Sequence, residues 1–175
     1  MFSFARGSKA RDELWRDAQP AALSLQTKVR YEPGLLPRLV RDYDELESRF
    51  TLLRAEVRDD PRLAELAGQN CAARLHELRR REALWLYPVI ACAIADDVDA
   101  RRQFLQLRLA MLGLARRLLR RFDQLAGAVH DGGDLPALLD EIGDELTEYR
   151  NRNESEIFPL YELMGRALAA PAHSA

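Results

Sequence analysis

Histidine and cysteine are scarce in this chain, and their scarcity limits the chemistry available to it. The 175 residues include three histidines, namely His76, His130 and His173, and two cysteines. Only His76 lies on a predicted bundle helix, so no Ser/His/Asp or Cys/His arrangement is visible. No CxxC motif or glycine-rich phosphate loop is present, and Gly132-Gly133 is an ordinary turn. The sequence therefore predicts a protein that is not an enzyme.

Long apolar runs and a large net charge are missing as well. No run approaches the ~20 residues that span a bilayer, and the segment 1–7 lacks the apolar stretch of a signal peptide. A net charge of −2 gives no drive toward nucleic acid or anionic membrane. Cys71 and Cys92 lie about 30 Å apart along one predicted helix, so they cannot pair. We expect buried free thiols in a cytoplasmic protein, with no nucleic-acid or membrane partner.

Apolar residues recur at spacings of three and four in four long segments, and no strand pattern competes with them. Asp60 and Pro61 are suited to begin the second segment, and Pro88 is expected to bend it. Because the connections are short, the sequence predicts an all-α, up-down-up-down four-helix bundle over residues 31–168. The predicted helices span residues 35–57, 61–95, 99–126 and 135–168.

The two ends of the chain lie outside this pattern. Residues 1–30 form an N-terminal extension with a weaker helical pattern over 8–30, broken at Pro20. It is predicted to pack across one end of the bundle or to extend from it. Residues 169–175 are predicted to be a frayed tail.

Two segments of the chain echo each other, Glu82 to Pro88 (EALWLYP) and Asn153 to Pro159 (NESEIFP). Each has polar residues followed by an aliphatic residue, an aromatic residue and a proline, near the end of a long helical pattern. With the entry Tyr31 to Leu36 (YEPGLL), they make residues 31–165 resemble the hemerythrin-like (HHE) family. The resemblance implies a four-helix bundle that holds a di-iron centre with histidines and carboxylates.

Most of the ligand positions that the resemblance implies carry other residues here. Tyr43, Leu78 and Tyr149 stand where the family has histidine, and Asn153 replaces a carboxylate. Glu82 keeps the carboxylate of the second helix. The resemblance therefore implies a degenerate site, and we expect no bound metal and no cofactor.

The third predicted helix strengthens this expectation, because it has no His, Asp, Glu or Cys from Arg101 to Phe122. In place of metal we predict a polar network of Tyr43, Glu82, Tyr149 and Asn153. Glu82 shares the core face with Trp85, so it needs a partner there, and Arg74 or Arg108 could supply one.

A second apolar ridge lies on the third helix, away from its core stripe and among arginines. The ridge is predicted to be covered by residues 8–30, by a second copy of the chain or by another protein. The fourth helix is acidic, so attraction between neighbouring helices is an alternative explanation for the arginines. The candidate partner surface comprises Leu105, Leu109, Leu112, Leu119, Arg108, Arg116 and Arg120.

Three functions remain open at this point. The first is a regulatory module that binds a protein partner through a bundle without a competent di-iron site. The second follows from residues 138–146 (LLDEIGDEL), which resemble the end helix of the Rsd/AlgQ regulators and imply sequestration of a bacterial sigma factor. The third is a metal, oxygen or redox sensor that keeps a residual site at Glu82, Glu154 and His76.

Overall fold

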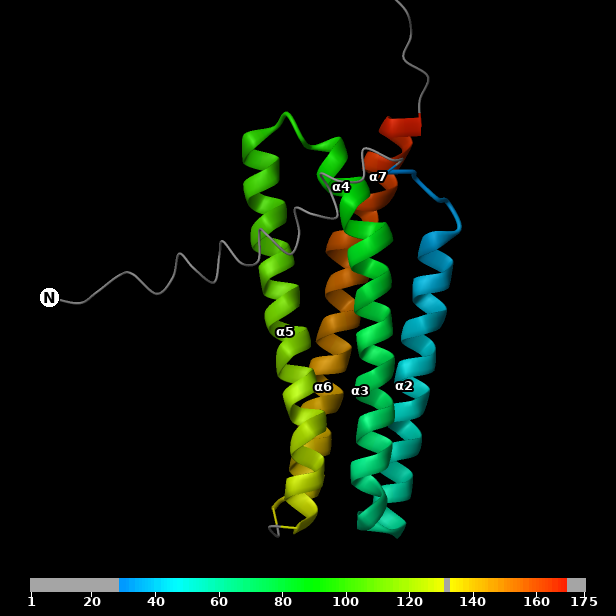
Figure 1. The fold of residues 1–175 in the computed structure, drawn as a ribbon, viewed down its shortest axis with the longest axis vertical. Coiled ribbons are helices and arrows are strands. Elements are labelled where there is room, and N and C mark those ends of the chain that lie inside the picture. Colours follow the sequence, from blue (N-terminus) through cyan, green and yellow to red (C-terminus); the bar gives the residue numbers. More distant parts are fainter. Residues whose placement is uncertain (1–28, 131–132, 170–175) are drawn as a thin grey trace, which may run out of the picture.

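The computed structural model describes residues 29–130 and 133–169, and within these ranges it is entirely helical (Figure 1). None of the described helices combines the length and the apolar character that a membrane crossing needs. Two π-helices interrupt the long rods, one at Glu82–Leu86 and one at Asn153–Ile157, and a 3-10 turn covers Pro61–Leu63. The α-helices are α2 (Leu35–Asp59), α3 (Ala64–Arg81), α4 (Tyr87–Ala93), α5 (Val98–His130), α6 (Leu135–Arg152) and α7 (Phe158–Ala169).

Aspartate side chains cap the start of the Pro61–Leu63 turn and the start of α6. Asp60 Oδ1 accepts a hydrogen bond from the Arg62 amide at 3.0 Å, and Pro61 occupies the first position of that turn, as predicted. Asp134 caps α6 in the same way by accepting from the Ala137 amide at 3.0 Å. Each cap satisfies backbone donors that have no partner within the helix.

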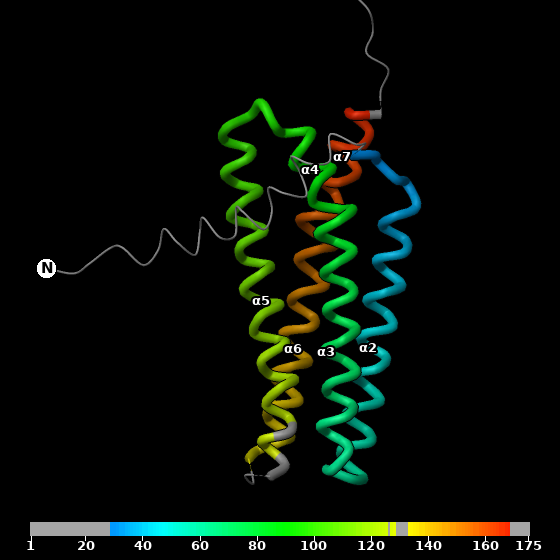
Figure 2. Tube along the Cα trace, viewed as in Figure 1, coloured from blue at the N-terminus to red at the C-terminus, as the bar shows by residue number. Residues whose placement is uncertain are grey.

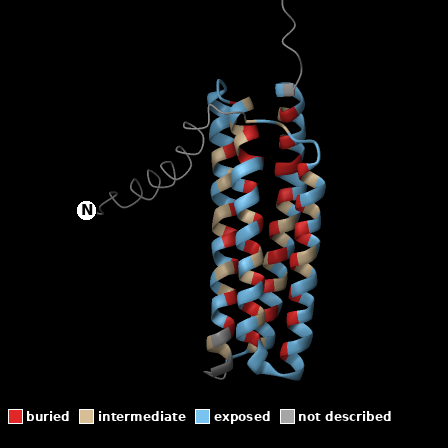
Figure 3. Ribbon diagram, turned by 45° about the vertical axis from the view of Figure 1, so that its right-hand side comes forward, coloured by how far each residue is buried: buried red, intermediate tan, exposed pale blue. Residues whose placement is uncertain are grey.

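The long helices lie side by side as a bundle (Figure 2), with α3 contacting both α2 and α5, and α5 contacting α6. Buried residues form stripes that face the interior of the bundle (Figure 3). At Gly68 of α3, an added Cβ would lie 2.9 Å from Leu125 Cδ1, so glycine permits the close approach of α5. At the opposite end α4 and α7 pack together, so the segments after the two π-helices are neighbours.

Tyr31 and Glu32, which precede α2, are held against α7. The hydroxyl of Tyr161 accepts from the Glu32 amide at 3.0 Å and contacts the Glu32 carbonyl oxygen at 3.1 Å. The Tyr31 ring lies 5.2 Å from the Tyr161 ring and covers Gly165, where a Cβ would overlap it. Val29 also packs on the core. The predictions for residues 1–28 and 170–175 lie outside the described residues.

The all-helical prediction is confirmed for the described residues, but the rods are less regular than the sequence pattern indicates. Immediately before Pro88 and Pro159, the amides of Tyr87 and Phe158 bond to the carbonyls of Glu82 and Asn153, five residues earlier. A proline removes an amide donor and crowds the preceding turn, which favours a local widening of the helix. The third helix also continues beyond residue 126, to His130.

The wider turn at the first π-helix contradicts the prediction that Trp85 faces the core. Trp85 was expected to share the core face with Leu78 and Glu82, but it is 57% exposed. The wider turn holds one more residue than an α turn, so the α-helical register of exposed and buried positions does not continue through it. Leu86, the next residue, is fully buried instead.

Candidate functional site

Glu82 is the centre of the most buried polar site in the described structure. It begins the first π-helix and is 1% exposed. The Tyr43 hydroxyl of α2 donates to Glu82 Oε1 at 2.5 Å, and the Tyr149 hydroxyl of α6 donates to Oε2 at 2.6 Å. The hydroxyl of Tyr87 lies 3.5 Å from Oε2. Both carboxylate oxygens are therefore satisfied by phenol groups from two other helices.

The electrostatics of this cluster follow from its burial. Desolvation raises the pKa of Glu82, and the hydrogen bonds from Tyr149 and Tyr43 act against that rise. Burial, followed by the neighbouring Glu82 carboxylate, raises the pKa values of Tyr43, Tyr149 and Tyr87 well above the ordinary value. The phenols therefore remain neutral donors at neutral pH.

Asn153 belongs to this region but does not bond to Glu82. It is fully buried at the start of the second π-helix, and its Nδ2 donates to the Tyr149 carbonyl at 3.1 Å. Its Oδ1 has no hydrogen-bond partner among the described residues. Leu78, the remaining position of the degenerate set, is buried in the apolar core. The predicted network is therefore present at three of its four members, and Asn153 supports it through the backbone of Tyr149.

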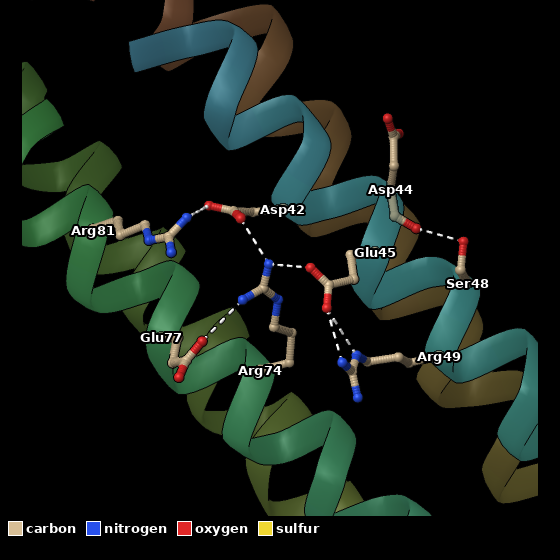
Figure 4. Close-up of polar contacts among 8 residues, drawn as sticks. All are labelled: Asp42, Asp44, Glu45, Ser48, Arg49, Arg74, Glu77 and Arg81. Atoms are coloured by element: carbon tan, nitrogen blue, oxygen red, sulfur yellow. Dashed lines mark hydrogen bonds and ion pairs between the residues drawn. The ribbon is translucent and has the colours of Figure 1, made fainter.

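The cationic partners predicted for Glu82 are wrong. Arg108 lies over the Tyr87 ring, with its guanidinium carbon 4.9 Å from the ring centroid. Arg74 points to the α2–α3 seam, where it donates to Asp42 at 2.7 Å, to Glu45 and to Glu77 (Figure 4). Helical periodicity placed Arg74 near the core face, but one helix alone does not show which neighbour its side chain meets.

Asp42 was missed by the sequence analysis. Its buried carboxylate accepts from Arg74 and also from Arg81 at 2.5 Å, so it joins α2 to two turns of α3 (Figure 4). Its place among the polar residues of α2 gives no sign of burial. The nearest signal is its position one residue before Tyr43, which faces the core.

Glu82, Glu154 and His76, which the alternative of a residual metal site requires, differ in exposure. Glu82 is buried, whereas Glu154 is exposed and accepts from Arg150 Nε at 2.7 Å. His76 is exposed on α3. No group of three or more His, Cys, Asp or Glu side chains suited to a metal ion occurs among the described residues.

The leucines of the α5 ridge differ in how far they are buried. Leu119 packs against the core, Leu105 and Leu112 are half-buried, and Leu109 is 37% exposed. Leu119 therefore reaches the core, contrary to the expectation for the whole ridge. Whether residues 8–28 cover the other three lies outside the described residues.

The arginines of α5 divide into two groups. Arg117 and Arg121 form ion pairs with the acidic face of α6, as the alternative explanation predicted. Arg108 is engaged with Tyr87, so only Arg116 and Arg120 of the predicted partner surface are exposed with no ion pair in the described structure. Attraction between helices therefore accounts for part of this charge.

The two cysteines also differ from the prediction. Both are free, but Cys71 is buried and Cys92 is exposed. Burial raises the pKa of the Cys71 thiol to about 11, so this thiol is protonated and unreactive at neutral pH.

Comparisons with known proteins give no family: no family model, no curated protein and no solved structure matches the chain.

Proposed function

We propose that this chain is a hemerythrin-like four-helix bundle without a competent di-iron site, which acts as a non-enzymatic, regulatory protein-binding module. The observation that carries the proposal is the pairing of both Glu82 oxygens with the hydroxyls of Tyr43 and Tyr149. These tyrosines stand at positions where the family resemblance implies histidine ligands. A neutral phenol whose pKa is raised by burial is a poor metal ligand, since it must lose its proton to coordinate.

The proposed up-down-up-down topology is supported by pairs between neighbouring helices. Arg54 pairs with Asp140 and Arg150 with Glu47, so later residues of α2 meet earlier residues of α6. The pairs of Arg117 with Glu145 and of Arg121 with Glu141 follow the same order between α5 and α6. Antiparallel neighbours joined by short connections are the arrangement of such bundles.

Binding, rather than chemistry, is favoured by what surrounds the site. Tyrosine rings fill the space beside Glu82, with the Tyr43 and Tyr149 centroids 6.1 Å apart and Phe158 6.3 Å from Tyr43. A carboxylate enclosed by aromatic rings holds the helices in register and leaves little access for a substrate. A protein partner then binds to the outer surface of the bundle.

Affinity purification of the full chain from host cells tests this function. The expected result is one protein recovered in near-stoichiometric amount that rebinds the chain after separate purification. A sigma factor as that protein would extend the resemblance of residues 138–146 to the Rsd/AlgQ regulators. A chain that rebinds no protein, or that turns over a substrate, would contradict the proposal.

A further inference from the structure

The two π-helices occupy equivalent places in the two halves of the chain. Each begins with a buried polar residue, Glu82 or Asn153, and ends with a buried aliphatic residue, Leu86 or Ile157. An aromatic residue and a proline follow in both cases. In each π-helix the three residues between the buried ends are exposed to solvent.

The exposed residues differ completely between the two turns. The second π-helix presents Glu154, Ser155 and Glu156, as expected for a solvated turn. The first presents Ala83-Leu84-Trp85, with Leu84 45% and Trp85 57% exposed. The second turn shows that the π-helical backbone needs no apolar side chains at these positions, so the backbone geometry does not explain Leu84 and Trp85. Adjacent exposed leucine and tryptophan indicate a contact surface.

The charges beside the two turns also differ. Arg150 and Arg152, which precede the second π-helix, are both paired with carboxylates. Before the first π-helix, Arg81 is paired with Asp42, but Arg80 is exposed and has no ion pair in the described structure. Arg80 lies one helical turn before Leu84, so it places an uncompensated positive charge next to the apolar residues.

We propose that Leu84, Trp85 and Arg80 form the docking surface for an acidic segment of a protein partner that carries apolar anchor residues. The proposal rests on the protein-binding function above and names its surface. Tryptophan and arginine are the residues that most often dominate binding energy at interfaces. Arg80 selects a negatively charged partner through charge complementarity.

A second copy of this chain fits the surface poorly. A two-fold contact would bring Arg80 against its own counterpart, and like charges repel. A head-to-tail contact with Glu154, Ser155 and Glu156 of another copy would offer acidic residues but no apolar anchors.

Site-specific photo-crosslinking tests the surface in the full chain. A photo-reactive residue is placed at Leu84, at Ser155 as the equivalent position of the second π-helix, and at Leu109 on α5. The expected result is one partner crosslinked in host cells from position 84, with little or no yield from positions 155 and 109. The crosslinked segment of the partner is expected to be rich in Asp and Glu around aliphatic or aromatic residues.

Binding of that purified partner is then measured with two double variants. Leu84→Glu with Trp85→Glu should weaken binding at least tenfold, whereas Ser155→Ala with Glu156→Ala should change it less than twofold. Binding should also weaken as the salt concentration rises. Thermal unfolding followed by circular dichroism checks that both variants fold, which is expected because all four side chains are exposed.

Any other outcome contradicts the proposed docking surface. A partner that crosslinks from position 109, or that binds the Leu84→Glu/Trp85→Glu variant normally, leaves the protein-binding function standing and removes this surface. Crosslinking of the chain to itself, or binding of the wild-type chain to anionic vesicles through Trp85, shows a different occupant. A chain with no partner from any position contradicts both the surface and the function.

Discussion

Glu82 and Asp42 are both buried carboxylates at the same level of the bundle, and they are satisfied by opposite means. Glu82 lies in the core and accepts from neutral tyrosine hydroxyls. Asp42 lies at the α2–α3 seam and accepts from Arg74 and Arg81. Neutral hydroxyl groups satisfy the carboxyl group in the core, whereas arginines pair with the carboxylate at the seam. The comparison shows that burial alone does not determine which kind of donor satisfies a buried carboxyl group.

The largest effect is expected when Glu82 loses both strong donors. In the double variant Tyr43→Phe/Tyr149→Phe, only the distant Tyr87 hydroxyl remains near the carboxylate. Two hydrogen bonds to a carboxylate, each worth about 1.5–3 kcal/mol, predict a loss of roughly 3–6 kcal/mol in the free energy of unfolding. Urea unfolding at pH 7 measures it. A loss below ~1 kcal/mol would show that the tyrosines do not stabilise the carboxylate.

The matching change at the seam is expected to cost less. Asp42→Asn removes the charge that joins Arg74 to Arg81, but Arg74 keeps Glu45 and Glu77 as partners. We expect a loss of about 1.5–3 kcal/mol, the value of one hydrogen bond to a charged group. Urea unfolding at low and at high salt measures this loss. A loss equal to that of the tyrosine double variant would abolish the distinction between the two sites.

The helical register that brings side chains to the Glu82 site could be predicted from the sequence only in part. Apolar spacing located the helices and the tyrosines, because Tyr43 and Tyr149 follow the regular α-helical stripe. Trp85 was misplaced because the same spacing was extended through a π-helix. The pairing of Asp42 with Arg74 could not be predicted, since each helix has several polar residues near the seam and only the packed structure selects one pair.

Glu82 in the core and Glu45, a partner of Arg74 at the seam, are expected to contribute oppositely to the pH dependence of stability. Burial raises the pKa of Glu82 above its unfolded value of about 4.3, so its folded form binds the proton more tightly. The contribution of Glu82 to the free energy of unfolding is therefore full below pH ~4.3, and it is lost as pH rises through the pKa of the folded state. Glu45 at the seam has its pKa lowered, mainly by the hydrogen bond from Arg49, so its contribution is lost as pH falls.

The substitution Glu82→Gln tests the pH dependence of the contribution that Glu82 makes to stability. The substitution is expected to cost about 1–3 kcal/mol at low pH, because an amide nitrogen replaces one of the two buried oxygens that accept from the tyrosine hydroxyls. The cost should shrink as pH rises above ~4.3, where the wild-type protein loses the contribution of Glu82. Guanidinium unfolding of both proteins from pH 4 to pH 8 measures the difference. A cost that grows with pH over this range would give the wrong sign and contradict a raised pKa.

The smallest effect is expected at the exposed rim of the seam. Glu77→Gln removes a solvent-exposed partner of Arg74, which still contacts Asp42 and Glu45. Exposed ion pairs contribute little, so the free energy of unfolding should change by less than about 1 kcal/mol. Thermal unfolding at two salt concentrations checks this, and Asp42→Asn serves as the positive control. A larger loss would mean that the rim, rather than Asp42, holds the seam together.

Metal analysis of the untagged, full-length protein purified from host cells tests the central claim most directly. The tyrosine hydroxyls occupy both oxygens of Glu82, and no cluster of metal ligands occurs in the described part of the chain. We predict iron and manganese far below one equivalent per chain and no charge-transfer absorption band. Iron or manganese near two equivalents per chain, together with such a band, would contradict the account.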